Sequence, residues 1–150
     1  MENQTRTFTL WFVLIAVGYV AYAAIFIFQS SFVVSGERFF TLFDDAMISM
    51  RYARNLADGF GLVWNPDGER GEGFTNPLWT LYMAFFHLLG IPQSKMGLPL
   101  QVSGALFLLM NIYFVGKLCH GLSRGAVFAS VFAMIFTAFY YPLSNWALLG

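Results

Sequence analysis

Long apolar runs constrain this chain more than any other feature. Three of them cover residues 8–34, 98–118 and 125–146, and the only charge within them is Lys117, near one end. A helix of about 20 apolar residues can cross the roughly 30 Å hydrocarbon core of a bilayer. We therefore expect three transmembrane helices and an all-α integral membrane fold. Charged residues make up only 11% of the chain, about half the share of a soluble domain.

A fourth apolar segment, residues 77–91, is harder to assign. Its 15 residues would rise only about 22 Å as a helix, which is short for a crossing. Pro77 suits a first helical turn, and Thr75 or Asn76 can cap it. Gly90 marks its end. The segment is predicted to be either a short fourth span or a re-entrant helix that lies in, or dips into, the membrane from the side of the preceding loop.

The positions of the cations help to choose between three and four spans. Cytoplasmic loops of membrane proteins tend to carry Lys and Arg residues. Three spans place Arg6, Lys117 and Arg124 on the cytoplasmic side and loop 35–76 outside, whereas four spans would leave only Arg6 and Lys95 inside. The sequence therefore favours three spans in a multi-pass protein of the cell membrane whose first loop is extracytoplasmic.

The loop of residues 35–76 is the one long polar stretch, and it holds most of the charge. Seven of the eight acidic residues lie in it: Glu37, Asp44, Asp45, Asp58, Asp67, Glu69 and Glu72. Four arginines accompany them: Arg38, Arg51, Arg54 and Arg70. The other cations are scattered beside apolar segments, so nucleic acid is not an expected partner, whereas the lipid bilayer is. Any chemistry is expected in this loop.

Within the loop, residues 46–57 are predicted to form an amphipathic helix that Asp44 or Asp45 caps and that stops at Gly59. Its apolar side chains are expected to rest on the membrane surface. Spacing alone favours the acid pair as a cap whose charge complements the helix dipole. Adjacent carboxylates at the water boundary can also share a divalent metal, or one can be the base that accepts a proton from an attacking hydroxyl.

A second local prediction concerns the part of the loop after this helix. Residues 62–64, Leu-Val-Trp, favour an extended conformation, and residues 65–68, Asn-Pro-Asp-Gly, carry proline and glycine where a type I turn favours them. The sequence therefore predicts a small hairpin that ends near Glu72.

The acid pair begins a longer pattern. It runs through the helix as Asp44-Asp45-Ala46-Met47-Ile48-Ser49-Met50-Arg51 and later reads Gly68-Glu69-Arg70-Gly71-Glu72-Gly73-Phe74-Thr75-Asn76-Pro77. This stretch, about residues 43–81, resembles the first extracytoplasmic loop of bacterial GT-C membrane glycosyltransferases, in particular the arabinofuranosyltransferase-like branch. The resemblance implies transfer of a hexosyl or pentosyl sugar from a polyprenyl-phosphate donor to a hydroxyl of a glycan, lipid or protein acceptor outside the cytoplasm.

The resemblance also implies roles for particular residues. Asp44 and Asp45 match the acidic motif that supplies the catalytic base or holds a divalent metal. The residues matched to donor binding are Arg51, Arg54, Arg70, Glu72 and Asn76. A guanidinium fork suits phosphate oxygens, but the arginines can equally pair with Asp58, Glu69 and Glu72. Asn76 is first a cap, and Glu72 can simply be solvated.

Members of the GT-C family are several times longer than 150 residues, so the resemblance covers an N-terminal portion only, and catalysis by this chain alone is not expected. A glycine-rich loop for a nucleotide-sugar donor does not occur in the sequence. The alternative is a non-catalytic small membrane protein or partner subunit, in which the loop is a binding module and the acids are caps.

Overall fold

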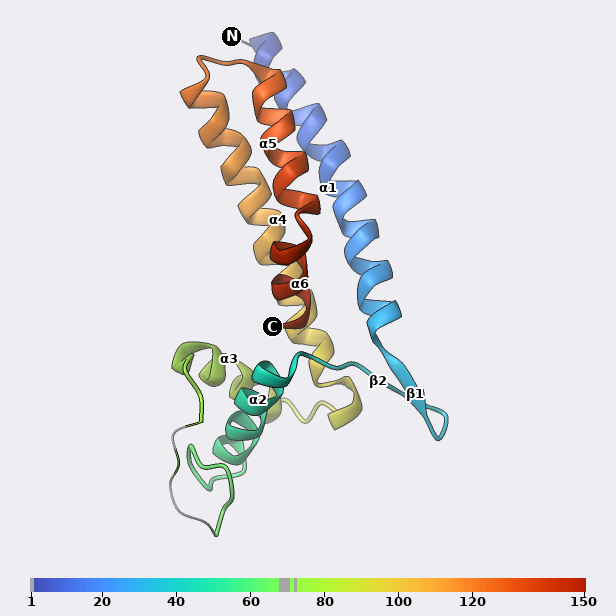
Figure 1. Ribbon diagram of the computed structural model, residues 1–150, viewed down its shortest axis with the longest axis vertical. Helices are drawn as coiled ribbons and strands as arrows, with labels where there is room; N and C mark the ends of the chain where they lie inside the picture. The colour runs from blue at the N-terminus through green and yellow to red at the C-terminus, as the bar shows by residue number, and fades with distance from the viewer. Residues whose placement is uncertain (1, 68–70, 72) are drawn as a thin grey trace. The chain divides into compact units, whose positions relative to one another are not determined.

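The computed structural model of the protein describes residues 2–67, 71 and 73–150 (Figure 1). Its elements, in order, are α1 (Glu2–Ser30), β1 (Phe32–Val34), β2 (Glu37–Phe39), α2 (Asp44–Ala57), α3 (Pro77–Leu88), the 3₁₀ turn η1 (Gln93–Lys95), α4 (Gly97–Leu122), α5 (Val127–Phe139) and α6 (Tyr141–Leu149). Contacts divide the chain into two units. We call Met1–Phe28 with Val102–Leu148 the span unit, and Gln29–Gln101 with Leu149–Gly150 the loop unit.

Two helices are long and apolar enough to cross a membrane, Gln4–Ser30 and Gln93–Leu122, and α5 with α6 makes a third if the bent pair counts as one span. The expected all-α architecture with apolar, span-length helices is therefore confirmed. Helix α3 has 12 residues, which rise about 18 Å, and it is not among these candidates. In the part of the chain that the structure describes, the number of candidate spans is thus two or three rather than four.

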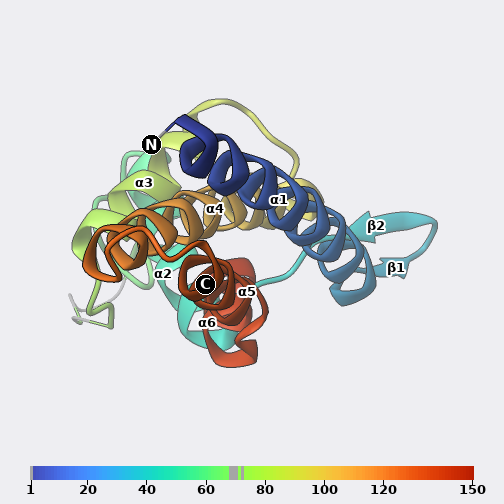
Figure 2. The same cartoon turned by 90° about the horizontal axis from the view of Figure 1, so that it is seen from above.

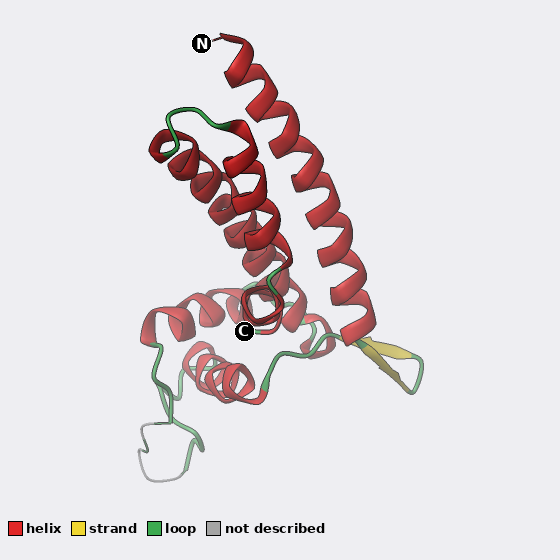
Figure 3. Ribbon diagram, turned by 45° about the horizontal axis from the view of Figure 1, so that its top comes forward, coloured by secondary structure: helices red, strands yellow, loops and turns green. Residues whose placement is uncertain are grey.

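The first apolar run does not stay helical to residue 34, as the sequence predicted. Helix α1 ends at Ser30, and β1 pairs antiparallel with β2, with Val34 opposite Glu37 (Figure 3). The two-residue connection has positive φ at Ser35 (50°) and Gly36 (83°), which is the geometry of a type I′ hairpin turn. Hydropathy reports that a residue is apolar but not its backbone conformation, so it could not separate this hairpin from the helix before it.

The third apolar run, predicted as one helix over 125–146, is two helices that meet at a bend of 51°. The break lies at Tyr140, whose ψ of 105° is extended. Pro142 has no N–H to donate to the carbonyl of Ala138, and its ring would clash with that carbonyl in a continuous helix. The Ser144 hydroxyl donates to the Ala138 oxygen instead, at 3.1 Å. The bend is therefore local to the proline and its backbone group is satisfied.

In the span unit, α1, α4 and α5 run alongside one another (Figures 1 and 2). Their close approach depends on glycines of α4. A Cβ added at Gly116 would lie 2.6 Å from the Met134 side chain of α5 and 3.4 Å from Phe8 of α1. A Cβ at Gly104 would overlap the backbone oxygen of Ala147 in α6. The absence of a side chain lets the helices pack at these points.

The loop unit is built on the pairing of α2 with α3. Its core contains Leu42, Ala46, Met50, Ala53, Met83, Ala84, Met96 and Leu100. We expected the apolar side chains of α2 to rest on the membrane surface, but Met50 and Ala53 are buried against α3 within this core. The prediction failed because the partner helix begins 20 residues after α2 ends, and a helical periodicity does not reveal what covers its apolar face.

Both ends of α2 follow local rules, although the start differs from the prediction. The N-cap position is Phe43, without a side-chain cap, and Asp44 and Asp45 are the first helical residues. The predicted stop is confirmed: Gly59 has φ of 87°. The Gly59 and Phe60 amides donate to the carbonyls of Leu56 and Asn55, at 3.1 and 2.9 Å. These bonds form a Schellman motif, which uses the left-handed glycine to satisfy helix-end carbonyls.

The predicted hairpin after α2 is not formed in its described part: residues 60–67 contain no strand. Side chains of α2 bind this segment instead. The Asn55 amide donates to the carbonyls of Val63 (2.7 Å) and Trp64 (2.9 Å). Because these carbonyls are taken by α2, they are not available to a neighbouring strand. The predicted end of the hairpin, Glu72, lies outside the described residues.

Candidate functional site

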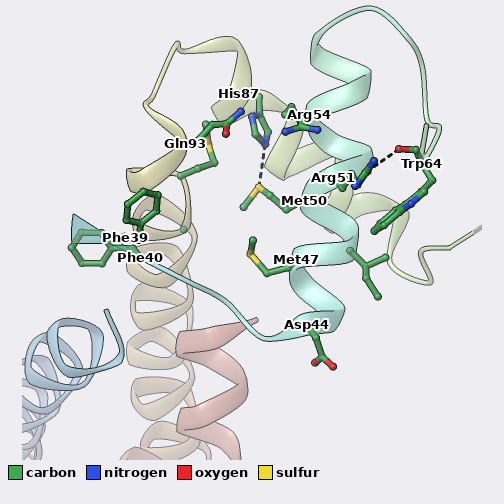
Figure 4. Close-up of a pocket in the computed structure, with 13 residues that line it drawn as sticks. Phe39, Phe40, Asp44, Met47, Met50, Arg51, Arg54, Trp64, His87 and Gln93 are labelled. Carbon is green, nitrogen blue, oxygen red and sulfur yellow. Dashed lines mark hydrogen bonds between the residues drawn. The ribbon is translucent and has the colours of Figure 1, made fainter. Parts of the chain in front are cut away.

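The loop unit contains a cavity of about 510 Å³ (Figure 4). Its walls come from β2, α2, the segment after α2, the end of α3, and the start of η1 and α4. The lining residues are Phe39, Phe40, Asp44, Met47, Ile48, Met50, Arg51, Arg54, Trp64, His87, Gln93, Met96 and Gly97. The cavity is therefore mostly apolar, with a small number of polar and charged groups, which is the usual character of a ligand pocket.

Helix α2 supplies most of the charged lining because of its spacing. Asp44 is followed at intervals of three and four residues by Met47, Ile48, Arg51 and Arg54, all of which line the cavity. Residues at i, i+3, i+4 and i+7 share one face of an α-helix. The helix thus presents an acid at its N-terminal end and two arginines toward its C-terminal end on the same face.

The two candidate catalytic acids have different positions. Asp44 lines the cavity, whereas Asp45, one residue further around the helix, does not. Both carboxylates are exposed, and the Asp45 amide donates to Asp44 Oδ1 at 3.1 Å. Their place in the first turn of α2 stabilises negative charge through the helix dipole. Of the pair, Asp44 is the one placed to meet a ligand in this cavity.

Arg51 is held by the segment after α2. Its Nε donates to the Trp64 carbonyl at 2.9 Å, and its Nη2 donates to Asn65 Oδ1 at 2.8 Å. Its guanidinium also lies 4.3 Å from the centroid of the Trp64 ring, at cation–π distance. Arg51 therefore fixes residues 64–65 against α2, and its hydrogen-bonding capacity is partly used.

Arg54, one turn further along α2, differs from Arg51. It is partly buried, and its side chain has no hydrogen bond or ion pair with a residue that the structure describes. The sequence allowed Asp58 as its partner, but that pair is not formed. Figure 4 places Arg54 with His87 and Gln93 at one end of the cavity, and Asp44 at the other.

His87 of α3 is a lining residue that the sequence did not single out as functional. Its Nε2 lies 3.1 Å from the Met50 sulfur. Burial is the main effect on this imidazole and lowers its pKa below the ordinary value of 6.5. The charge of Arg54 lowers that pKa further, while Asp58 and a hydrogen bond with the Met50 backbone raise it. His87 is therefore mainly neutral near pH 7, and an anion beside it would raise its pKa.

The other matched residues stand outside the cavity lining or outside the described chain. Asn76 occupies the N-cap position of α3, and its Oδ1 accepts a hydrogen bond from Ser49 at 2.9 Å. This bond joins α2 to α3, and the Asn76 side chain makes no cap hydrogen bond. Arg70 and Glu72 lie outside the described residues.

The acid pair is the part of the chain matched to a divalent metal. In residues 2–67, 71 and 73–150, no group of three or more His, Cys, Asp or Glu side chains is placed to hold an ion. Two adjacent carboxylates fit the manner in which Mg²⁺ binds, through one or two carboxylates while waters and substrate phosphate complete its shell. Asp44 and Asp45 are the residues that would hold such an ion, and its role stays a prediction.

Comparison of the chain with protein-family models, with curated proteins and with solved structures gave no match. Function must therefore be argued from the cavity. Of the lining residues, the sequence analysis proposed Asp44, Arg51 and Arg54 as site residues and missed the others, which include the polar side chains of His87 and Gln93. Nothing near His87 in the sequence marks it as functional, because its contact is Met50, 37 positions distant. No local signal could have found this contact.

Proposed function

We propose that this chain carries the acceptor-activating part of a GT-C type glycosyltransferase, which transfers a sugar from a polyprenyl-phosphate donor to a hydroxyl on a glycan, lipid or protein on the extracytoplasmic side of the cell membrane. The supporting observation is the arrangement along one face of α2, where Asp44 and Arg54 line the two ends of a single, largely apolar cavity. The proposal assigns Asp44 as the base and the arginine end to the phosphate.

The separation of the two ends suits an inverting displacement. Arg54 follows Asp44 by ten positions along the helix, a rise of about 15 Å. In an in-line attack, the acceptor hydroxyl and the leaving phosphate lie on opposite sides of the reacting sugar carbon. The base takes the hydroxyl proton on one side, and cations stabilise the negative charge that develops on the phosphate on the other. A sugar ring between these ends satisfies both requirements.

The apolar lining supports a donor with a hydrocarbon part. Phe39 of β2, Phe40 after it and Met96 before α4 line the cavity, and Figure 4 shows the two phenylalanines apart from α2. An isoprenoid chain gains free energy by leaving water for such a surface, about 25 cal/mol per Å² of apolar area buried. A nucleotide sugar has no hydrocarbon chain to bury against these side chains.

The test is to replace Asp44 by Asn in the longest natural form of the chain and to measure polyprenyl-linked sugar transfer in membranes. Loss of a general base lowers the transfer rate by about 10²- to 10⁴-fold. Asp67→Asn is the matched control, because it removes the same charge from an exposed residue of the same loop, outside the cavity lining and the acid pair, and should have a smaller effect. Unchanged transfer by Asp44→Asn at normal expression would contradict the proposal and favour the non-catalytic alternative, a membrane subunit with a binding loop.

A further inference from the structure

We propose that Arg54, His87 and Gln93 form the site that recognises a phosphodiester joined to an apolar chain, and that Arg51 is a positioning residue for the segment after α2. This inference rests on the proposed donor class and adds His87 and Gln93, from α3 and η1, to the anion-binding residues. It also separates the two arginines of α2, which the sequence treats alike.

The state of the two guanidinium groups is the first argument. Arg51 donates to two oxygens and lies over the Trp64 ring. Arg54 has no such acceptor among the residues that the structure describes, although it is partly buried. A guanidinium held in an apolar wall loses hydration, and it regains free energy when an anionic ligand supplies acceptor oxygens. Arg54 therefore offers the more complete fork to a phosphate.

His87 and Gln93 supply the second argument. Both line the cavity at the end where Arg54 lies (Figure 4). The His87 Nε2 lies 3.1 Å from the Met50 sulfur, and a thioether is a weak acceptor. A phosphate oxygen is a far stronger one. The amide of Gln93 can donate to an uncharged ester oxygen. Together the three side chains provide donors from two sides of the cavity.

The third argument is that the apolar part of the ligand has a place next to this polar end. Met50, Met96 and Phe40 line the same cavity as the charged groups. A free phosphate ion would leave these side chains in contact with water. A phosphodiester that carries an isoprenoid chain uses both the donors and the apolar wall, so the structure favours that ligand class.

The binding test uses the purified full chain in detergent and three probes: farnesyl methyl phosphodiester, farnesol and dimethyl phosphate. The first has both the charge and the chain, the second lacks the charge, and the third lacks the chain. We expect calorimetric binding of the first to be at least tenfold tighter than that of either other probe. Equal affinity for farnesol would mean that the site does not recognise the phosphate charge. Equal affinity for dimethyl phosphate would mean that the site does not recognise the isoprenoid chain. Either result would overturn the inference.

Variants then assign the site. Arg54→Gln should weaken binding of the phosphodiester by about tenfold or more, the usual loss when a hydrogen bond to a charged group is removed. Lys95→Gln, which removes the same charge from η1 outside the cavity lining, should leave the affinity within about twofold. Thermal unfolding of each variant shows whether it is folded, and Arg54→Lys should restore part of the affinity. A loss in Arg51→Gln without a loss in Arg54→Gln would reverse the assignment and overturn the inference.

The contribution of His87 has a pH signature. Its charged neighbours are Arg54 and Asp58, both from α2 and its C-terminal cap, and Arg51 lines the same cavity. A bound anion favours the imidazolium, so binding takes up a proton and becomes tighter as the pH falls from 8 toward 6. The single charge of the phosphodiester does not change in this range. His87→Gln should abolish the pH dependence of binding. If His87 had only a structural role, its replacement would leave that pH dependence in place.

Failure of this inference can be told apart from failure of the proposed function. Asp44→Asn should lose sugar transfer but keep the affinity for the phosphodiester. If that variant retains transfer, the catalytic assignment fails while the anion site stands. If Arg54→Gln keeps full affinity for the phosphodiester, the anion site fails while Asp44 can still be the base.

Discussion

The two units of this protein use polar side chains in different ways. In the span unit, the hydroxyls of Thr9, Ser130 and Thr137 each donate to the carbonyl four residues earlier in the same helix. In the loop unit, polar groups join distant elements: Ser49 to Asn76, Arg51 to Trp64, Ser94 to Glu37 and Gln101 to Thr41. The helices of a span must satisfy their backbone internally, whereas a folded loop is assembled by such cross-links. Helix approach should therefore decide stability in one unit, and long-range hydrogen bonds in the other.

The largest effect is expected at the closest helix approach in the span unit. A Cβ at Gly104 overlaps the backbone oxygen of Ala147, so Gly104→Ala must push α4 and α6 apart and should destabilise the protein by about 3 kcal/mol. Thermal unfolding in detergent measures the change. A Cβ added at Gly121 in the same helix would meet no atom within 4 Å. Gly121→Ala should therefore leave the stability of the protein unchanged or raise it by about 0.5–1 kcal/mol. Equal effects of the two substitutions would contradict the close approach of α4 and α6.

The second effect tests the long-range hydrogen bonds of the loop unit. Asn55 is 3% exposed, and Asn55→Ala removes the donor to the carbonyls of Val63 and Trp64. We expect a loss of about 2 kcal/mol and faster hydrogen exchange after α2. Ser130→Ala is the matched change in the span unit and should cost less than about 0.5 kcal/mol, because the Ala126 carbonyl keeps its bond from the Ser130 amide, at 3.4 Å. Similar losses in both variants would remove the distinction between the units.

The smallest effect is on the pH dependence of the loop unit. Burial lowers the pKa of His87 below 6.5, so near that pH the unfolded chain binds more protons than the folded one. The stability that a neutral His87 allows is present above pH 6.5, and it falls as the pH drops through the lowered pKa of the folded state. After correction for the intrinsic pH dependence of exchange, the amides of α3 should therefore lose protection between pH 7.5 and pH 5. The loss should be larger in the unmodified protein than in His87→Gln. An identical response in both proteins would show that His87 is not desolvated.

Several features were predictable because they depend on neighbouring residues alone. The apolar runs specify span-length helices, and Gly59 and Pro77 mark the end of α2 and the start of α3 through the backbone conformations that these residues allow. The concentration of charge in residues 35–76 pointed to the loop as the location of any site. Each of these conclusions follows from composition or from a few adjacent positions.

Other features were not predictable because they depend on what lies opposite a residue. The sequence treated Phe32–Val34 as helix, but pairing with β2 makes it a strand. It placed a hairpin after α2, where Asn55 takes the carbonyls of residues 63 and 64. Both errors concern backbone groups whose partners are supplied by another part of the chain.

The sequence by itself determined that the chain has apolar helices of spanning length and one charged loop, since hydropathy and helix-end residues act locally. Only the tertiary structure decided which acid of the Asp44 and Asp45 pair lines the cavity, and that Arg51, but not Arg54, is hydrogen-bonded to a residue in the described part of the chain. The tertiary structure also places His87 next to Met50, 37 positions away. The physical reason is that what a side chain of α2 contacts depends on how α3 and the segment after α2 pack against that helix.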